Sequence, residues 1–194
     1  MTPAFSMCIY CGSRSGANTR FVAVAREVGT WIGAHGGQLV YGGGHNGLMG
    51  EVADATLAAG GRVVGVIPKA LVEKEWAKRD CTELHIVESM HDRKQMMAER
   101  ADAFLALPGG IGTFEELFEV WTWRQLGYHA KPMGLLDVDG YYQPLLQFLR
   151  ASVQQGFMSD WQLALVKVVT DAPALLRSLV QDAGVTPPAD LTQI

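Results

Sequence analysis

Short runs of β-forming residues alternate with amphipathic stretches along the chain, and this alternation is the feature that most constrains its fold. It is typical of βα units, which build a parallel sheet with helices on both faces. We therefore predict an α/β protein with a Rossmann-like, doubly wound and mostly parallel sheet. The predicted strands span residues 6–11, 38–41, 62–67, 83–87, 103–107, 133–136 and 166–169. The predicted helices span residues 19–35, 48–59, 90–101, 114–126, 142–155 and 172–182.

The length and continuity of the chain indicate how many domains it forms. Its 194 residues suit one domain, since about 100–200 residues per domain is usual. Neither an internal repeat nor an interdomain linker divides the sequence. We therefore expect a single domain over residues 1–194, with a frayed tail from about residue 185.

Charge and composition exclude several kinds of partner. The formal net charge of −4 gives no long-range attraction for nucleic acid or for an anionic membrane. The sequence lacks a signal peptide pattern and an apolar run of about 18 residues, so we expect no membrane association and a cytoplasmic protein. The five histidines are scattered without metal-ligand spacing, so no metal is expected. Cys8 and Cys11 should point to opposite faces of their strand, which excludes a shared redox or metal role.

Glycine is in surplus, at 22 residues or about 11% of the chain against about 7% on average. The surplus gathers in segments 12–16, 42–47 and 108–113, each of which follows a predicted strand. Ligands of open α/β sheets bind at the carboxyl ends of the strands, where glycine admits a phosphate close to the backbone and the next helix supplies N–H groups. Three such loops on one edge favour a nucleotide or a sugar phosphate, although any one of them could be a tight turn.

Two common nucleotide-binding motifs do not fit the sequence well. Gly42-x-Gly44-x-x-Gly47 matches the dinucleotide fingerprint, but it follows the second strand, and no acidic residue ends the next strand to hold a ribose. A Walker-type loop needs Gly-Lys, which does not occur in the sequence, so nucleoside triphosphate hydrolysis is disfavoured. No cofactor is expected.

Charged residues occur at two places where a charge is unfavourable unless it has a partner or a chemical role. Arg93 and Lys94 share the apolar stripe of the predicted helix 90–101, so either an anion pairs with them or they snorkel at the edge of the core. Thr113 to Glu116 fits a capping box, in which the Glu116 carboxylate would bond the start of its helix. Glu115 and Glu116 would also lie beside the predicted phosphate site, which is unfavourable unless one of them has a chemical role. The spacing leaves both interpretations of Glu116 open.

Segments 89–94 (SMHDRK) and 107–117 (LPGGIGTFEEL) resemble the signature of the LOG ("lonely guy") family. This family comprises cytokinin riboside 5′-monophosphate phosphoribohydrolases, which were long labelled possible lysine decarboxylases. The resemblance continues through 41–50 (YGGGHNGLMG) and 123–132 (WRQLGYHAKP), and it covers nearly everything from residue 6 to about residue 170.

The resemblance implies hydrolysis of the N-glycosidic bond of an N6-substituted adenosine 5′-monophosphate, which gives free base and ribose 5-phosphate. It implies Arg93 and Glu116 as the catalytic pair. The substrate-binding positions that it implies are Glu75, Lys94, Gly110, Ile111, Gly112, Thr113, Phe114, Glu115 and Thr122. We expect contacts at the phosphate end from Ser13, Arg14 and Gly109 as well.

Two alternatives to this hydrolase function remain open. The chain could be a nucleotide-binding or carrier protein without turnover, in which Glu116 only caps its helix, or a plain AMP nucleosidase.

The predicted helix 114–126 is apolar nearly all round, so another layer of the fold or a second subunit must cover it. Members of the LOG family form homodimers, and the resemblance implies a homodimer here.

Overall fold

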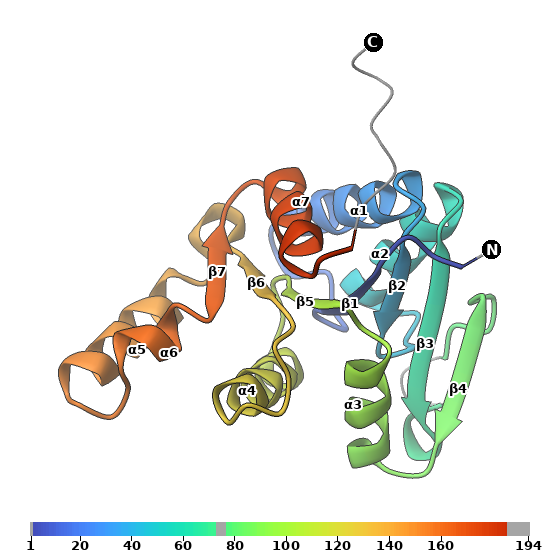
Figure 1. The fold of residues 1–194 in the computed structure, drawn as a ribbon. Helices are drawn as coiled ribbons and strands as arrows, with labels where there is room; N and C mark the ends of the chain where they lie inside the picture. Colours follow the sequence, from blue (N-terminus) through green and yellow to red (C-terminus); the bar gives the residue numbers. More distant parts are fainter. Residues whose placement is uncertain (1, 73–76, 186–194) are drawn as a thin grey trace.

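Seven parallel strands form a single sheet in the computed structural model, which describes residues 2–72 and 77–185 (Figure 1). The strand order is β4-β3-β2-β1-β5-β6-β7, and each of the six neighbouring pairs is parallel. The strands are β1 (Ser6–Tyr10), β2 (Gln38–Tyr41), β3 (Arg62–Pro68), β4 (Glu83–Val87), β5 (Ala103–Ala106), β6 (Met133–Leu136) and β7 (Val166–Val169). The predicted α/β fold is confirmed, and the strand bounds match the prediction to within one residue.

Helices cover both faces of the sheet (Figure 1). The helices are α1 (Thr19–Ala34), α2 (Gly47–Ala58), α3 (Met90–Glu99), α4 (Ile111–Gln125), α5 (Gln143–Gln154), α6 (Asp160–Leu163) and α7 (Ala172–Asp182), with short 3₁₀ turns at Lys69–Leu71 and Val138–Gly140. Helices α1, α2 and α7 pack on one face, and α3, α4 and α5 pack on the other. Cys8 and Cys11 belong to the cores of opposite faces, as predicted.

Helices α1 and α2 approach each other closely because glycine faces the contact. A Cβ added at Gly33 would lie 2.6 Å from the carbonyl oxygen of Thr56 and 2.7 Å from the Cβ of Ala59. A side chain at this position would therefore force the two helices apart. The close packing fixes α1 and α2 relative to each other, and the loops that precede both helices lie at the carboxyl edge of the sheet.

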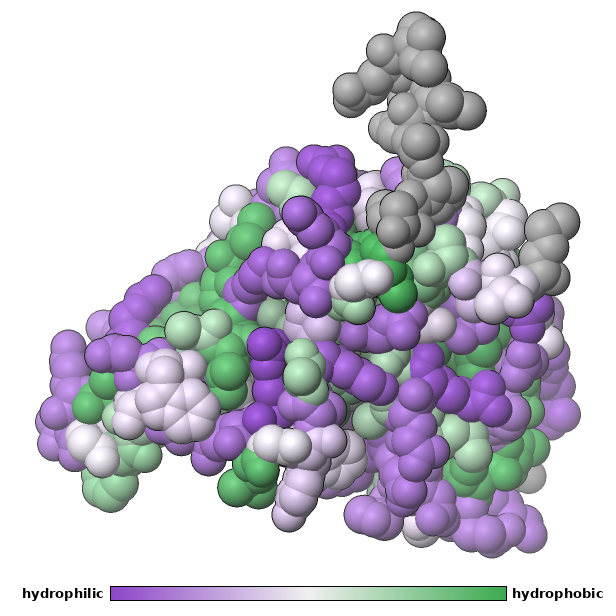
Figure 2. Space-filling view, in the orientation of Figure 1, coloured by the Kyte–Doolittle hydropathy of each residue, from purple (hydrophilic) through white to green (hydrophobic). Residues whose placement is uncertain are grey.

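The surface of the molecule is mixed in polarity. Figure 2 shows polar residues over most of one face, with apolar residues gathered over β7, α5 and α6. Phe148 and Phe157 on this side are 67% and 86% exposed. Within the described ranges, no helix has both the length and the apolar character that a membrane crossing requires.

The strand order contains one point where the winding direction reverses. The chain runs outward from β1 through β2 and β3 to β4, and then returns to place β5 on the other side of β1. The loops after β1 and β5 therefore diverge and leave a crevice at the carboxyl edge of the sheet. Such a switch point is where open α/β sheets bind their ligands.

Candidate active site

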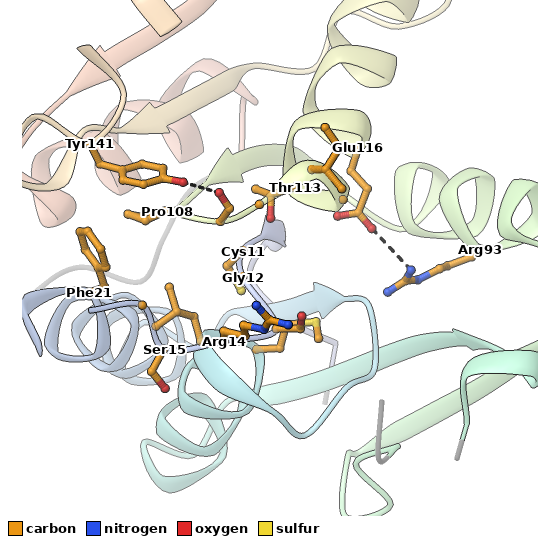
Figure 3. Close-up of a pocket in the computed structure, with 18 residues that line it drawn as sticks. Cys11, Gly12, Arg14, Ser15, Phe21, Arg93, Pro108, Thr113, Glu116 and Tyr141 are labelled. Carbon is orange, nitrogen blue, oxygen red and sulfur yellow. Dashed lines mark hydrogen bonds and ion pairs between the residues drawn. The ribbon is translucent and has the colours of Figure 1, made fainter. Parts of the chain in front are cut away.

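A cavity of about 500 Å³ lies at this switch point, between the loop after β1 and the loop after β5 (Figure 3). Its volume is in the range of about 300–1,000 Å³ that is typical of small-molecule sites. The lining residues are Cys11, Gly12, Ser13, Arg14, Ser15, Gly16, Phe21, Leu48, Met49, Arg93, Pro108, Gly109, Gly110, Ile111, Gly112, Thr113, Glu116 and Tyr141. The cavity therefore contains two of the three predicted glycine loops, together with the predicted pair Arg93 and Glu116.

Helix α4 begins at the cavity without a side-chain cap. Its N-cap is Gly110, and no side chain bonds the first turn, although the sequence had predicted that Thr113 would cap a helix starting at residue 114. That prediction is wrong because the helix begins at Ile111, directly after an extended Gly110, and this places Thr113 inside the first turn. The first-turn N–H groups and the positive end of the helix dipole thus remain available to an anion.

Two glycines of this loop have no packing reason to be glycine. A Cβ added at Gly110 or at Gly112 would meet no atom within 4 Å. At Gly109, by contrast, a Cβ would lie 2.1 Å from Oγ1 of Thr113, so packing within the loop requires glycine there. The open space above Gly110 and Gly112 is where a group bound to the helix N-terminus would lie.

Arg93 reaches the cavity from α3 and is only 5% exposed. Its Nε donates to the carbonyl oxygen of Val66 (3.2 Å) and its Nη2 donates to that of Gly42 (3.0 Å), so the ends of β2 and β3 hold the guanidinium. A Cβ at Gly42 would lie 2.1 Å from Nη2, which explains the glycine at this position. Nη1 of Arg93 lies 3.8 Å from Oε1 of Glu116 (Figure 3). Of the two interpretations offered by the sequence, a buried cation paired with an anion is the one observed.

Glu116 lies in the second turn of α4, and its side chain is 12% exposed. Because α4 starts at Ile111, this carboxylate is too far along the helix to serve as the predicted cap. It lines the cavity beside Arg93 instead. Burial raises the pKa of the neighbouring Cys11 thiol, and the negative charge of Glu116 raises it further. Cys11 therefore stays protonated, and a thiolate nucleophile is disfavoured.

Several predicted residues lie outside the cavity lining. Phe114 packs edge-on against Tyr142, with ring centroids 6.3 Å apart. Lys94 pairs with Glu115 (2.5 Å) and with Glu119 (3.0 Å), so these charges form a cluster between α3 and α4. Thr122 bonds the carbonyl oxygen of Phe118 on an exposed face of α4. Glu75 falls outside the described residues.

Sequence reasoning missed the aromatic end of the cavity. Phe21 comes from α1 and Tyr141 from the connection between β6 and α5, and their rings meet edge-on with centroids 5.5 Å apart. Nothing local to residues 21 or 141 indicates this contact, since it depends on the packing of distant segments. Within the described part of the chain, no cluster of three or more His, Cys, Asp or Glu side chains could hold a metal ion.

Comparisons with known proteins show which family the sequence resembles. The family model described as "Possible lysine decarboxylase" matches residues 49–179. The chain is 50% identical over 173 residues to the probable cytokinin riboside 5′-monophosphate phosphoribohydrolase LOGL9 of Oryza sativa subsp. japonica, covering 89% of this chain and 76% of that protein. It is 45% identical over 173 residues to the cytokinin riboside 5′-monophosphate phosphoribohydrolase LOG2 of Arabidopsis thaliana, covering 89% and 81%.

Solved structures extend the likeness at the level of the fold. The Moco carrier protein from Chlamydomonas reinhardtii superimposes with a TM-score of 0.72 at 20% identity, covering 95% of this chain and 99% of that one. An identity this low shows a common fold and nothing about the ligand. The family model and the curated relatives each span most of the sequence, and they place the chain in the LOG family.

Proposed function

We propose that the protein hydrolyses the N-glycosidic bond of an N6-substituted adenosine 5′-monophosphate, releasing the free base and ribose 5-phosphate. The observation that carries this proposal is the position of Glu116, which lies beside the buried Arg93 in a cavity that also contains the uncapped start of α4. A carboxylate and an anion-binding helix end in one cavity suit a substrate with a phosphate at one end and a reacting sugar at the other. The names of the curated relatives support the same reaction.

The phosphate end of the substrate is assigned to the start of α4. The first-turn N–H groups and the helix dipole favour an anion there, and Gly110 and Gly112 leave it room. Arg14 and Ser13 lie on the opposite wall of the cavity and add a positive charge and a hydroxyl group. Binding energy from the phosphate, which takes no part in the reaction, can then be used to orient the bond that breaks.

The reaction needs a negative charge close to the ribose. When the bond between C1′ and the base nitrogen breaks, its electron pair leaves with the base, which takes up one proton to become the free base, and positive charge develops on the ribose. Glu116 can stabilise that charge and accept a proton from the water that attacks C1′. Arg93 cannot act as a general acid, because a guanidinium stays charged at neutral pH. Its two carbonyl contacts make it a fixed positive group that orients the Glu116 carboxylate.

The surroundings of Lys94 give little support to the description "lysine decarboxylase". A pyridoxal phosphate enzyme needs a lysine amine that can form a Schiff base. Burial lowers the pKa of Lys94, but its bonds to Glu115 and Glu119 outweigh burial and raise it overall. Lys94 is thus held as an ammonium ion outside the cavity lining, and the hydrolase proposal needs no lysine nucleophile.

We further propose that the chain is a single cytoplasmic domain that forms a homodimer through the α3–α4 side. Large apolar side chains are exposed there, among them Met90 at 42% and Leu126 at 58%. A second subunit on this side would also cover Glu115 and Thr122, whose predicted substrate contacts the cavity lining of one chain does not include. Light scattering after size exclusion should give twice the mass of one chain, and a stable monomer would contradict the dimer.

The reaction is tested by incubating the protein with N6-isopentenyl-AMP and with AMP and measuring free base and ribose 5-phosphate by chromatography. We expect stoichiometric release of both products. Faster turnover of plain AMP would indicate an AMP nucleosidase, and binding without any release of base would indicate a carrier. The matched variant Glu116→Gln should lower kcat by about 10²–10⁴-fold, because a positioned acid–base group contributes about that much, while nucleotide binding is retained.

A further inference from the structure

The connection between β6 and α5, residues 137–142, contacts the wall of the cavity that carries α4. The hydroxyl of Tyr141 donates to the carbonyl oxygen of Gly109 (2.5 Å), and this bond is drawn in Figure 3. The hydroxyl of Tyr142 donates to the carbonyl oxygen of Leu107 (2.6 Å). Two successive tyrosines thus hold the backbone of the glycine loop at two points, just before α4 begins.

The same connection also contacts the opposite wall. Asp139 accepts a hydrogen bond from Nδ2 of Asn18 (2.8 Å), and Asn18 in turn caps α1 by accepting from the backbone N–H of Arg20 (2.9 Å). The ring of Tyr141 meets the ring of Phe21 on α1 edge-on, at 5.5 Å. One short segment, distant in sequence from both walls, therefore links the loop after β1 to the loop after β5.

The connection is itself held in a defined conformation. Asp137 is 2% exposed, and its carboxylate accepts from the backbone N–H of Tyr142 (2.8 Å) and from the side-chain amide of Gln143. Asp139 adopts a φ of 51°, the one positive φ at a non-glycine residue in the described part of the chain. Such a conformation persists only where its surroundings over-determine it, and it often occurs near functional sites.

We propose that residues 137–142 act as a brace that fixes the distance between the two walls, and that Tyr141 and Asp139 are positioning residues for the 5′-phosphate of the substrate. The identity of the ligand rests on the proposed function. Tyr141 acts through Gly109, because its bond holds the loop whose next residues start α4. A loop that is already fixed loses little conformational freedom when the phosphate binds, and this lowers the cost of binding.

The test compares Tyr141→Phe with the matched control Tyr128→Phe, which removes a hydroxyl from a tyrosine that is 76% exposed and outside the cavity lining. Affinities for ribose 5-phosphate and for adenosine, which lacks the phosphate, are both measured by calorimetry, which needs no turnover. Because Tyr141→Phe lacks one hydrogen bond, its Kd for ribose 5-phosphate should be about 3- to 10-fold higher than that of the wild type. For Tyr141→Phe, the Kd of ribose 5-phosphate should rise by a larger factor than that of adenosine, and KM for the nucleotide should rise by a larger factor than kcat falls. Tyr128→Phe should match the wild type throughout.

A second variant covers the case in which Tyr141→Phe does not fold. Asn18→Ser keeps a good N-cap for α1 but removes the amide that bonds Asp139, and it should weaken ribose 5-phosphate binding about 2- to 4-fold. The brace is overturned if the folded variants bind ribose 5-phosphate as tightly as the wild type does. It is equally overturned if their affinity for adenosine falls by the same factor as their affinity for ribose 5-phosphate. It is also overturned if the wild type does not bind ribose 5-phosphate. Wild-type protein that binds ribose 5-phosphate but releases no base would refute the proposed hydrolysis and leave the brace measurable.

Discussion

The variant Gly112→Ala separates two reasons for a glycine at the start of α4. Gly112 is a helical residue of the first turn, and an added Cβ would meet no atom within 4 Å. Alanine in a compatible helical position stabilises a protein by about 0.4–1 kcal/mol relative to glycine, mainly because the unfolded chain loses freedom. For a chain of this size, that corresponds to a rise in Tm of about 1–4 °C.

The same variant should bind phosphate less well. If the space above Gly112 receives the phosphate, the added methyl group prevents one phosphate oxygen from reaching the first-turn N–H groups. A hydrogen bond to a charged group is worth about 1.5–3 kcal/mol, so the Kd for ribose 5-phosphate should rise by at least about tenfold. A more stable protein that binds its ligand less tightly is the expected outcome.

Calorimetric titration and thermal unfolding of the same preparation test this reasoning. Gly33→Ala is the matched control, because its Cβ would lie 2.6 Å from the carbonyl oxygen of Thr56 at the α1–α2 contact, far from any phosphate role. It should lower Tm and leave the Kd of the folded protein unchanged. Wild-type affinity in Gly112→Ala would refute the assignment of the phosphate to this helix end.

Three further predictions concern single substitutions. Gly42→Ala should displace Arg93, lower kcat/KM for the nucleotide and destabilise the fold by about 1.5–3 kcal/mol in urea titrations, since its Cβ would meet Nη2 at 2.1 Å. Cys11→Ala should keep kcat within about threefold of the wild-type value, because burial keeps the thiol protonated and a protonated thiol is a poor nucleophile. A much larger fall in the rate of base release would show that the sulfur takes part in catalysis. Nζ of the buried Lys78 donates to both carboxylate oxygens of Asp80 at 2.9 Å, and this contact lowers the pKa of Asp80. The pairing therefore stabilises the fold above about pH 4, and this stabilisation is lost as the pH falls below that. Lys78→Met should reduce the loss of stability in acid, measured as the urea midpoint from pH 6 to pH 3.

Most of the fold could be predicted because its signals are local. The strands read as short runs of β-forming residues, and β2, β4, β6 and β7 have the predicted bounds. Burial on both faces holds for the inner strands β2 and β6, whereas the edge strands β4 and β7 are partly exposed. The start of α4 could not be predicted, because the N-cap position is a glycine that has no capping side chain, while Thr113 and Glu116 match the capping-box pattern. Helix α6 was missed because four residues give no periodicity.

The site was predictable only in part. The glycine loops indicated the edge of the sheet. The charge of Arg93 on an apolar stripe left two interpretations open, a buried ion pair and a snorkelling cation, and the structure contains the buried pair. Tyr141 and Phe21 carry no such signal, because their contact brings together segments 120 residues apart in number. The substrate-binding roles of Lys94 and Thr122 were implied by the resemblance alone, and both residues lie outside the cavity lining of a single chain.

The central place of β1 has a consequence for the order in which the protein can assemble during translation. β1 is synthesised early and can pair with β2 soon afterwards, but its other edge waits for β5, whose Ala103 pairs with Met7. Until the ribosome has released residues 103–106, an apolar strand exposes an unpaired edge, which favours association with other chains. Nascent or truncated chains that end before β5 thus lack the loop after β5 that forms one wall of the cavity, and they are prone to aggregate.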